Sequence, residues 1–163
     1  MSDTNNKNLK VKIISKPTEH DDFDSMTAPL RGANLIEASA GTGKTYSIAI
    51  LALRLILEEN IPIDKILMVT FTRDAAAEME LRVRNFIREG LQIVRMIEKK
   101  KEDAEFEGMD TQIISLIKKA IGVIGIKESE ERLQNALLQF DKAAIYTIHS
   151  FCSRILGEYA FET

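Results

Sequence analysis

Apolar and polar residues alternate along the first half of this chain in the pattern of an α/β protein. A short apolar run at residues 33–37 leads into a glycine-rich loop, and residues 48–59 follow that loop with helical spacing. A helix-breaking sequence at residues 60–62 precedes a second apolar run at residues 65–71. This second run predicts a strand that is buried on both faces, as strands of parallel sheets are. The order is therefore strand, loop, helix, strand.

The second half of the chain is predicted to be mainly helical. A long helix begins at about Arg73, and Gly108 followed by Asp110 predicts a break and then the N-terminus of another helix. Apolar residues at three- and four-residue spacing mark the buried faces of three helices: Met79, Val83, Phe86, Ile87 and Leu91; Ile113, Leu116, Ile117 and Ala120; and Leu133, Ala136, Leu137 and Phe140. Residues 143–147 return to strand character before a last helix, and we expect the strands to be parallel neighbours.

Composition indicates a soluble globular domain but does not identify its partners. A length of 163 residues is enough for one domain with a core, and the apolar fraction of 45% and charged fraction of 29% are ordinary. The net charge of −3 provides no overall basic field, so any nucleic-acid contact must come from a local groove. The single cysteine and the absence of a signal-peptide pattern favour a cytoplasmic protein, and no membrane role is expected.

Residues 38–45 form the clearest motif of the chain. Their sequence, Ala-Ser-Ala-Gly-Thr-Gly-Lys-Thr, fits the phosphate-binding loop except that Ala38 replaces a glycine. Gly41 and Gly43 allow successive backbone N–H groups to point at phosphate oxygens, and the following helix adds positive potential. Lys44 is expected at the β- and γ-phosphates, and Thr45 at the bridging Mg²⁺ ion. The motif therefore predicts binding of ATP and Mg²⁺, although kinases, GTPases and motors share it.

The predicted nucleotide-binding residues are Ala38, Ser39, Ala40, Gly41, Thr42, Gly43, Lys44 and Thr45. Lys44 and Thr45 are also the predicted catalytic residues, and Thr45 is the predicted metal ligand.

Three segments in this order resemble the superfamily 1, UvrD-like DNA helicases. They are the phosphate loop, residues 69–79 (Val-Thr-Phe-Thr-Arg-Asp-Ala-Ala-Ala-Glu-Met) and residues 147–152 (Thr-Ile-His-Ser-Phe-Cys). Within that superfamily, residues 29–45 and 143–152 are most similar to the RecB family, the beta subunits of exodeoxyribonuclease V. The resemblance covers about residues 29–163 and implies a P-loop NTPase fold of the RecA-like type, in which helices flank a parallel sheet.

The domain organisation follows from this resemblance and from the pattern of polar residues. Residues 29–90 and 141–163 are expected to belong to the first helicase motor domain, which binds ATP. Residues 91–140 are expected to form an all-helical insertion, the start of helicase subdomain 1B. Residues 1–28 are polar and predict a flexible N-terminal arm.

In superfamily 1 helicases the second and third segments line the path of single-stranded DNA, so the resemblance implies DNA contacts here. The expected DNA-binding residues are Thr70, Phe71, Thr72, His149 and Ser150. The ring of Phe71 suits stacking on a base, and the hydroxyl groups suit contacts with phosphates. Each residue has an alternative role: Phe71 as a core aromatic, Thr72 and Ser150 as helix N-caps, and His149 as a structural histidine.

The acidic pair that ATP hydrolysis requires in such helicases is missing, because the sequence contains no Asp-Glu dipeptide. Residues 136–141 imitate a strand that ends in Asp141, but their periodicity favours a helix. We therefore expect an N-terminal fragment that binds ATP weakly, hydrolyses it negligibly and neither unwinds nor cuts DNA.

The resemblance implies a function only for the whole protein. That function is an ATP-dependent DNA helicase and exonuclease that acts on double-stranded DNA ends in recombinational repair, with RecC and RecD as partner subunits. The alternatives are an AddA or UvrD-like helicase, a small stand-alone P-loop ATPase that uses Asp141 for its metal, and a regulatory fragment without turnover. AddA usually has a glutamine upstream of the loop, and no glutamine precedes the loop here.

Overall fold

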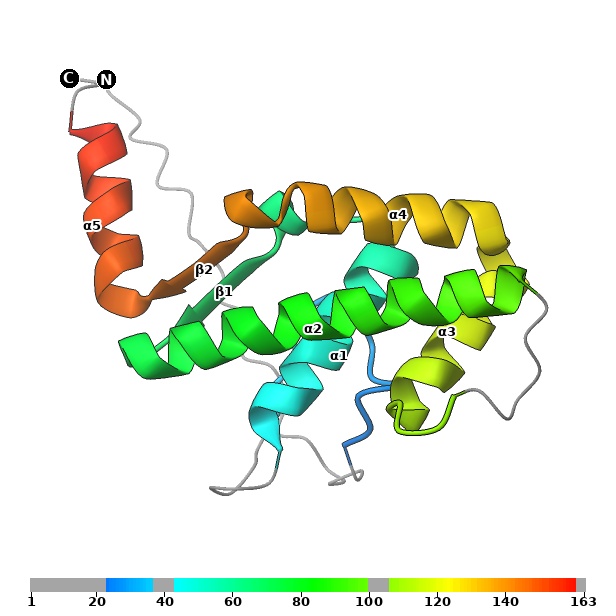
Figure 1. Ribbon diagram of the computed structural model, residues 1–163. Helices are drawn as coiled ribbons and strands as arrows, with labels where there is room; N and C mark the ends of the chain where they lie inside the picture. Colours follow the sequence, from blue (N-terminus) through cyan, green and yellow to red (C-terminus); the bar gives the residue numbers. More distant parts are fainter. Residues whose placement is uncertain (1–22, 37–42, 100–105, 161–163) are drawn as a thin grey trace, which may run out of the picture.

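A computed structural model describes residues 23–36, 43–99 and 106–160 of the chain (Figure 1). Its elements are α1 (Lys44–Leu57), the short 3₁₀ helix η1 (Ile63–Lys65), β1 (Leu67–Thr70), α2 (Arg73–Glu98), α3 (Thr111–Ile124), α4 (Ile126–Leu138), the 3₁₀ helix η3 (Phe140–Lys142), β2 (Ala144–Thr147) and α5 (Ile148–Tyr159). The helix–strand order agrees with the sequence pattern from residue 44 onward.

The body of the molecule consists of the long helix α2 and of α1, α3 and α4, which pack against it. Figure 1 shows α4 running alongside α2, α1 crossing behind them, and α5 projecting from the end of β2. The helices meet through the apolar faces predicted from the sequence, and Val83, Ile117 and Leu133 are fully buried. Phe140 is buried as predicted but belongs to η3 rather than to α4, because α4 ends at Leu138.

Gly90 lies on the face of α2 that packs against Ile117 of α3 and Leu133 of α4. A Cβ atom added at Gly90 would stand only 3.1 Å from Cδ1 of Ile117, which is tighter than almost all real contacts of a Cβ atom. Glycine in the interior of a helix costs about 1 kcal/mol relative to alanine. Glycine at this position therefore lowers the intrinsic stability of α2 but leaves room for the Ile117 side chain of α3.

The strands β1 and β2 pair in parallel, with Leu67 opposite Ala144 and Thr70 opposite Thr147. This pairing confirms the predicted parallel neighbours. The prediction that β1 is buried on both faces is wrong: Met68 is buried, whereas Leu67 and Val69 are 48% and 42% exposed. The reason is that α2 packs against the pair, while no second helical layer among the described residues covers the Leu67 and Val69 side.

The first predicted strand is absent from the part of the chain that the structure describes. Residues 33–36 have no regular structure, and Leu35 is 85% exposed. A strand requires a partner for its backbone groups, and this segment pairs with neither β1 nor β2. The described residues thus contain a mixed helix and strand arrangement with a two-stranded parallel sheet.

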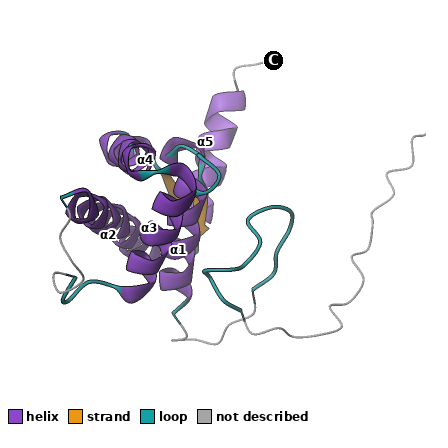
Figure 2. Ribbon diagram, turned by 90° about the vertical axis from the view of Figure 1, so that its right-hand side faces the viewer, coloured by secondary structure: helices purple, strands orange, loops and turns teal. Residues whose placement is uncertain are grey.

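Residues 23–28 are hydrogen-bonded to α1, so they are part of the folded domain rather than of the predicted flexible arm. Figure 2 shows their loop beside α1. Ser25 is buried, and Arg54 Nη1 donates hydrogen bonds to the carbonyl oxygens of Ser25 and Ala28, each at 2.8 Å. Residues 1–22 of the predicted arm lie outside the described residues.

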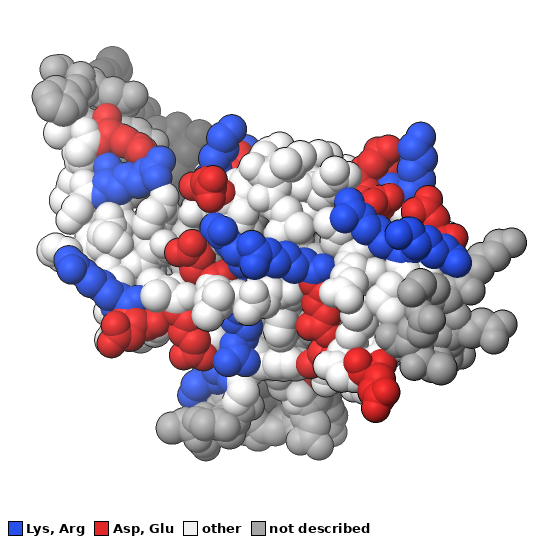
Figure 3. Space-filling model, viewed as in Figure 1, with Lys and Arg blue, Asp and Glu red and all other residues white. Residues whose placement is uncertain are grey.

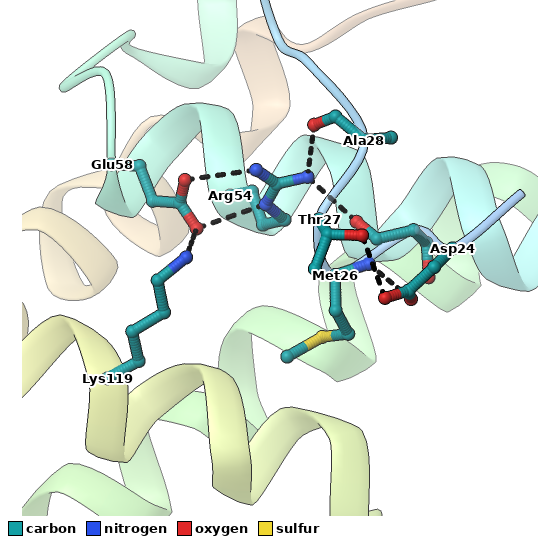
Figure 4. Close-up of polar contacts among 8 residues, drawn as sticks. Asp24, Met26, Thr27, Ala28, Arg54, Glu58 and Lys119 are labelled. Atoms are coloured by element: carbon teal, nitrogen blue, oxygen red, sulfur yellow. Dashed lines mark hydrogen bonds and ion pairs between the residues drawn. The ribbon is translucent and has the colours of Figure 1, made fainter.

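Arg54 is the buried centre of this attachment. It is 4% exposed, and its Nε and Nη2 atoms donate to the Glu58 carboxylate at 3.0 and 3.1 Å (Figure 4). Lys119 Nζ of α3 reaches the same carboxylate at 3.3 Å. Burial alone would raise the pKa of Glu58, but the hydrogen bonds and charges of Arg54 and Lys119 outweigh burial and lower it below its ordinary value.

We expect Arg54→Met to lower the free energy of unfolding by about 3 kcal/mol, because two carbonyl oxygens lose their donor and the Glu58 carboxylate keeps Lys119 but loses the buried guanidinium. Urea unfolding at pH 7 measures the loss. The folded pKa of Glu58 is depressed, so its contribution is complete above the ordinary pKa and disappears as the pH falls through the folded pKa. The pH dependence of stability below about pH 5 should therefore weaken in the variant.

The matched control for this prediction is Arg31→Met, which removes another arginine that pairs with a glutamate near the end of α1. Arg31 pairs with Glu59 at 2.7 Å, but its side chain is 87% exposed, so its loss should change stability far less. Equal destabilisation by the two substitutions would contradict a buried anchoring role for Arg54.

Candidate nucleotide and DNA site

The described part of the phosphate loop is its final turn into α1. Gly43 has φ 81° and ψ 22°, a left-handed conformation that favours glycine, and Lys44 and Thr45 open the helix. The N-cap residue Gly43 has no side chain that could cap the helix. The N-terminus of a helix carries positive potential, and its first backbone N–H groups can bind an anion. The predicted residues Ala38, Ser39, Ala40, Gly41 and Thr42 lie outside the described residues.

A cavity of about 250 Å³ opens at this turn, between α1 and α2. Lys44 and Thr45 line it from α1, and Glu78 and Arg82 line it from α2. Arg82 Nη2 donates to Glu78 Oε1 at 3.2 Å. Lys44, Arg82 and the helix N-terminus bring positive potential to one small volume, and Thr45 contributes a hydroxyl group of the kind that Mg²⁺ accepts.

Sequence reasoning did not select Glu78 or Arg82 as site residues. The available signal was their i, i+4 spacing, which marks an acidic and a basic residue on one face of a helix. That signal indicates an exposed ion pair and says nothing of Lys44. Only the packing of α2 against α1 places the pair beside the phosphate loop.

A second cavity lies at the carboxyl ends of the two strands. Thr70 faces Thr147 in the register of the sheet, so the residues that follow both strands emerge at one edge. Phe71, His149 and Ser150 line an open groove of about 460 Å³ there. Three of the five residues predicted to bind DNA are thus brought together, although Phe71 is far from the other two in sequence.

The side chain of Phe71 is 89% exposed, so the alternative reading as a core aromatic is wrong. A phenyl ring that stays in water gives up the stabilising free energy that its burial in the core would have contributed. Its ring is free to meet a planar ligand in the groove. His149 is also exposed, at the start of α5.

The hydroxyl groups of this region hold the turns that form the groove. Thr72 accepts a hydrogen bond from the backbone N–H of Ala75 at 3.1 Å, which confirms it as the N-cap of α2. Thr70 Oγ1 donates to the carbonyl of Thr72 at 3.1 Å. These bonds fix the backbone on either side of Phe71.

Ser150 is not an N-cap, because α5 begins three residues before the position that the sequence suggested. Thr147 is the N-cap, and Ser150 completes a capping box with it. Ser150 N–H donates to Thr147 Oγ1 at 3.1 Å, and Thr147 N–H donates to Ser150 Oγ at 3.0 Å. The box sets the angle at which α5 leaves β2 and thereby positions His149.

Tyr146 is a further groove residue that sequence reasoning missed. Its ring lies 6.4 Å from the ring of Phe151, and the guanidinium carbon of Arg154 stands 5.5 Å from its centroid. Arg154 also donates to the Tyr146 hydroxyl and, at 2.8 Å, to Glu158. In the sequence Tyr146 is simply an aromatic residue in a short predicted strand, and such a residue is more often part of a hydrophobic core than of a binding site.

The remaining sequence prediction in this region concerns Asp141. Its neighbours form the helix α4 and the 3₁₀ helix η3, so the helical interpretation of residues 136–141 is confirmed. The Asp141 carboxylate is 93% exposed, pairs with Arg84 at 3.4 Å and lines neither cavity. This position gives no support to a metal-binding role.

Charge is mixed on the face of the molecule that Figure 3 shows, where Lys and Arg side chains alternate with Asp and Glu. Along α2 the pairs Glu78–Arg82 and Glu80–Arg84 follow i, i+4 spacing. No single basic surface is visible on this face. No helix among the described residues is long and apolar enough to cross a membrane.

Comparison with known proteins adds to this geometry. The model of the UvrD/REP helicase N-terminal domain matches residues 20–163 of the chain. The chain belongs to this helicase family. The match includes both cavities and the elements that line them.

Individual relatives of this helicase-family chain are RecB subunits of the RecBCD enzyme. The subunit of Haemophilus influenzae is 39% identical over 148 residues, which is 86% of this chain. Those of Buchnera aphidicola (subsp. Schizaphis graminum) and Escherichia coli are each 37% identical, over 158 and 149 residues, which are 92% and 86% of this chain. The chain spans 12% of the length of each of these three relatives.

Proposed function

We propose that this chain is the ATP-binding, N-terminal part of a RecB-like subunit of exodeoxyribonuclease V. The whole protein would be an ATP-dependent DNA helicase and nuclease that acts on double-stranded DNA ends in recombinational repair. The observation that carries the proposal is the position of the first turns of α2. Glu78 and Arg82 face the cavity at the phosphate loop, while Arg73 and Glu80 face the groove that contains Phe71 and His149.

The nucleotide half of the proposal rests on the cavity at the start of α1. Lys44 would contact the β- and γ-phosphates, and the Thr45 hydroxyl would bind the Mg²⁺ that bridges them. Arg82 is placed to balance phosphate charge from the opposite wall, since it lines the same cavity. The residues present fit the group, because a helix N-terminus, two cationic side chains and the Thr45 hydroxyl line one small cavity.

The DNA half of the proposal rests on the groove beside β1 and β2. The exposed ring of Phe71 would stack on a base of single-stranded DNA, and Thr70, Thr72, His149 and Ser150 would contact its backbone. Such contacts hold a strand without reading its sequence, as a helicase requires. A rigid helix between the two cavities would let closure around ATP act on the DNA groove.

We also propose that the two strands belong to a larger parallel sheet of the RecA-like P-loop type. Parallel strands are normally buried on both faces, yet Leu67 and Val69 are 48% and 42% exposed. Leu35, exposed in an irregular segment, suits a further strand next to this pair. In this arrangement residues 29–90 and 141–163 form part of the motor domain and residues 91–140 the helical insertion, with α2 shared between them.

The comparisons favour RecB over the other helicase readings and over a stand-alone ATPase, since three RecB subunits match most of the chain. By the same similarity, the partners of the whole protein would be RecC, RecD and the end of a DNA duplex, and its location would be the cytoplasm. We infer that the 163 residues alone hydrolyse ATP negligibly, because they contain no Asp-Glu dipeptide. Robust DNA-stimulated ATP turnover by the purified chain would contradict this inference.

Lys44→Ala should weaken binding of ATP-Mg²⁺ by about one to two decades, because it removes charged hydrogen bonds worth about 1.5–3 kcal/mol. Titration with a fluorescent ATP analogue measures the change. Lys65→Ala is the control, since Lys65 is an exposed lysine of η1 that pairs with its neighbour Asp64 at 3.6 Å and lines neither cavity. An unchanged affinity in Lys44→Ala would argue against the assigned phosphate site.

Phe71→Ala should weaken binding of single-stranded DNA by about fivefold or more, since stacking on one base contributes about 1–3 kcal/mol. Fluorescence anisotropy with a labelled oligothymidine measures the affinity. The matched control is Leu138→Ala, which removes another highly exposed apolar side chain, at the end of α4 and outside the groove. Equal losses in the two variants would show that Phe71 has no special contact with DNA.

A further inference from the structure

Tyr46 follows Thr45 in the first turn of α1, and its side chain leads to another helix. The Tyr46 hydroxyl donates to the Asp110 carboxylate, at 2.8 Å from Oδ1 and 2.9 Å from Oδ2. Its ring meets the ring of Phe86 edge to face, with centroids 5.2 Å apart and an angle of 75°. The ring contact fixes the side chain on α2, and the hydroxyl then reaches across to the residue before α3.

Asp110 is also the residue that starts α3. As the N-cap, its carboxylate accepts from the backbone N–H groups of Gln112 and Ile113, at 2.8 and 3.2 Å. Its own N–H donates to Glu89 of α2 at 2.6 Å. The phosphate-binding turn of α1, the middle of α2 and the first turn of α3 therefore meet at one aspartate.

The hydroxyl of Tyr46 is a stable donor in this position. Burial raises its pKa far above the ordinary value, and the hydrogen bond to Asp110 and the negative charges of Asp110 and Glu89 raise it further. The hydroxyl stays protonated at any pH at which the protein works. The hydroxyl therefore keeps the proton that it donates to Asp110.

We propose that Tyr46 is a positioning residue that couples nucleotide binding at the start of α1 to the ordering of the start of α3. The inference rests on the proposed function, in which phosphates bind the first turn of α1. A phosphate held by the N–H groups of that turn restricts the backbone that carries Tyr46. Tyr46 passes this restriction to Asp110, whose carboxylate caps α3. A ligand that orders one part of such a linked pair reduces the cost of ordering the other, and the coupling is reciprocal.

The test uses the whole 163-residue chain and the slowly hydrolysed nucleotide ATPγS with Mg²⁺. Amide hydrogen exchange is measured with and without the nucleotide in the unaltered chain and in Tyr46→Phe, which keeps the ring on Phe86 and removes only the hydroxyl. In the unaltered chain the nucleotide should slow exchange in the first turn of α1 and at Gln112 and Ile113. In Tyr46→Phe the protection of α1 should remain, whereas the protection at α3 should fall by about fivefold or more.

Two further variants separate coupling from folding. Asp110→Asn keeps a good N-cap but replaces the charged acceptor, so it should weaken the nucleotide-dependent protection of α3 and leave α3 helical. Ser115→Ala is the control, because it removes an exposed hydroxyl of α3 that donates to the Thr111 carbonyl within the same helix at 2.8 Å. It should leave the protection of both helices unchanged.

The outcomes distinguish this inference from the proposed function. Protection of α1 without protection of α3 in the unaltered chain would overturn the coupling and leave nucleotide binding intact. Full protection of α3 in Tyr46→Phe would overturn the role of the hydroxyl. If the nucleotide failed to protect the first turn of α1 itself, the proposed nucleotide site would fail, and the coupling with it.

Discussion

The burial of the apolar face of α2 is the interaction on which the rest of the structure depends. One face of this helix packs against α1, α3 and α4, and Val83 and Ile87 are almost completely buried there. Burying two such side chains contributes about 1.5–3 kcal/mol each. Because burial of the apolar face fixes the rotation of α2 about its own axis, it also determines the directions in which the polar residues of α2 point. Glu78 and Arg82 face the start of α1, and Arg73 and Glu80 face the ends of the strands.

Much of this arrangement could be predicted from the sequence. Helical periodicity predicted α2, α3 and α4 with their buried residues, and Asp110 was recognised as an N-cap because aspartate after a glycine break has few other roles. The parallel pairing of β1 and β2 was predicted as well. These successes depend on local rules of spacing and capping, which operate within a few residues.

Predictions failed where the answer depends on contacts between distant segments. The apolar run at residues 33–37 has the composition of a strand, but composition cannot provide a partner strand. Residues 23–28 were assigned to an arm together with the polar residues before them, because the sequence does not show that Arg54 binds their carbonyl groups. Arg82 and Tyr146 were not predicted as site residues, because only the packing of helices and strands brings them to the two cavities. The roles of the site residues in binding ATP and DNA stay predictions.

The parallel direction of β1 and β2 has a consequence for the helices between them. A chain that leaves one end of a strand must return to the opposite end before it can form a parallel neighbour. Here α2, which is 26 residues and about 39 Å long, makes the outward journey, and α3 and α4 bring the chain back. The crossover connection is therefore made by these three helices. A change in the length of one of these helices would have to be compensated elsewhere before β2 could keep its register with β1, whereas a change in a loop between them would leave the packed helices as they are.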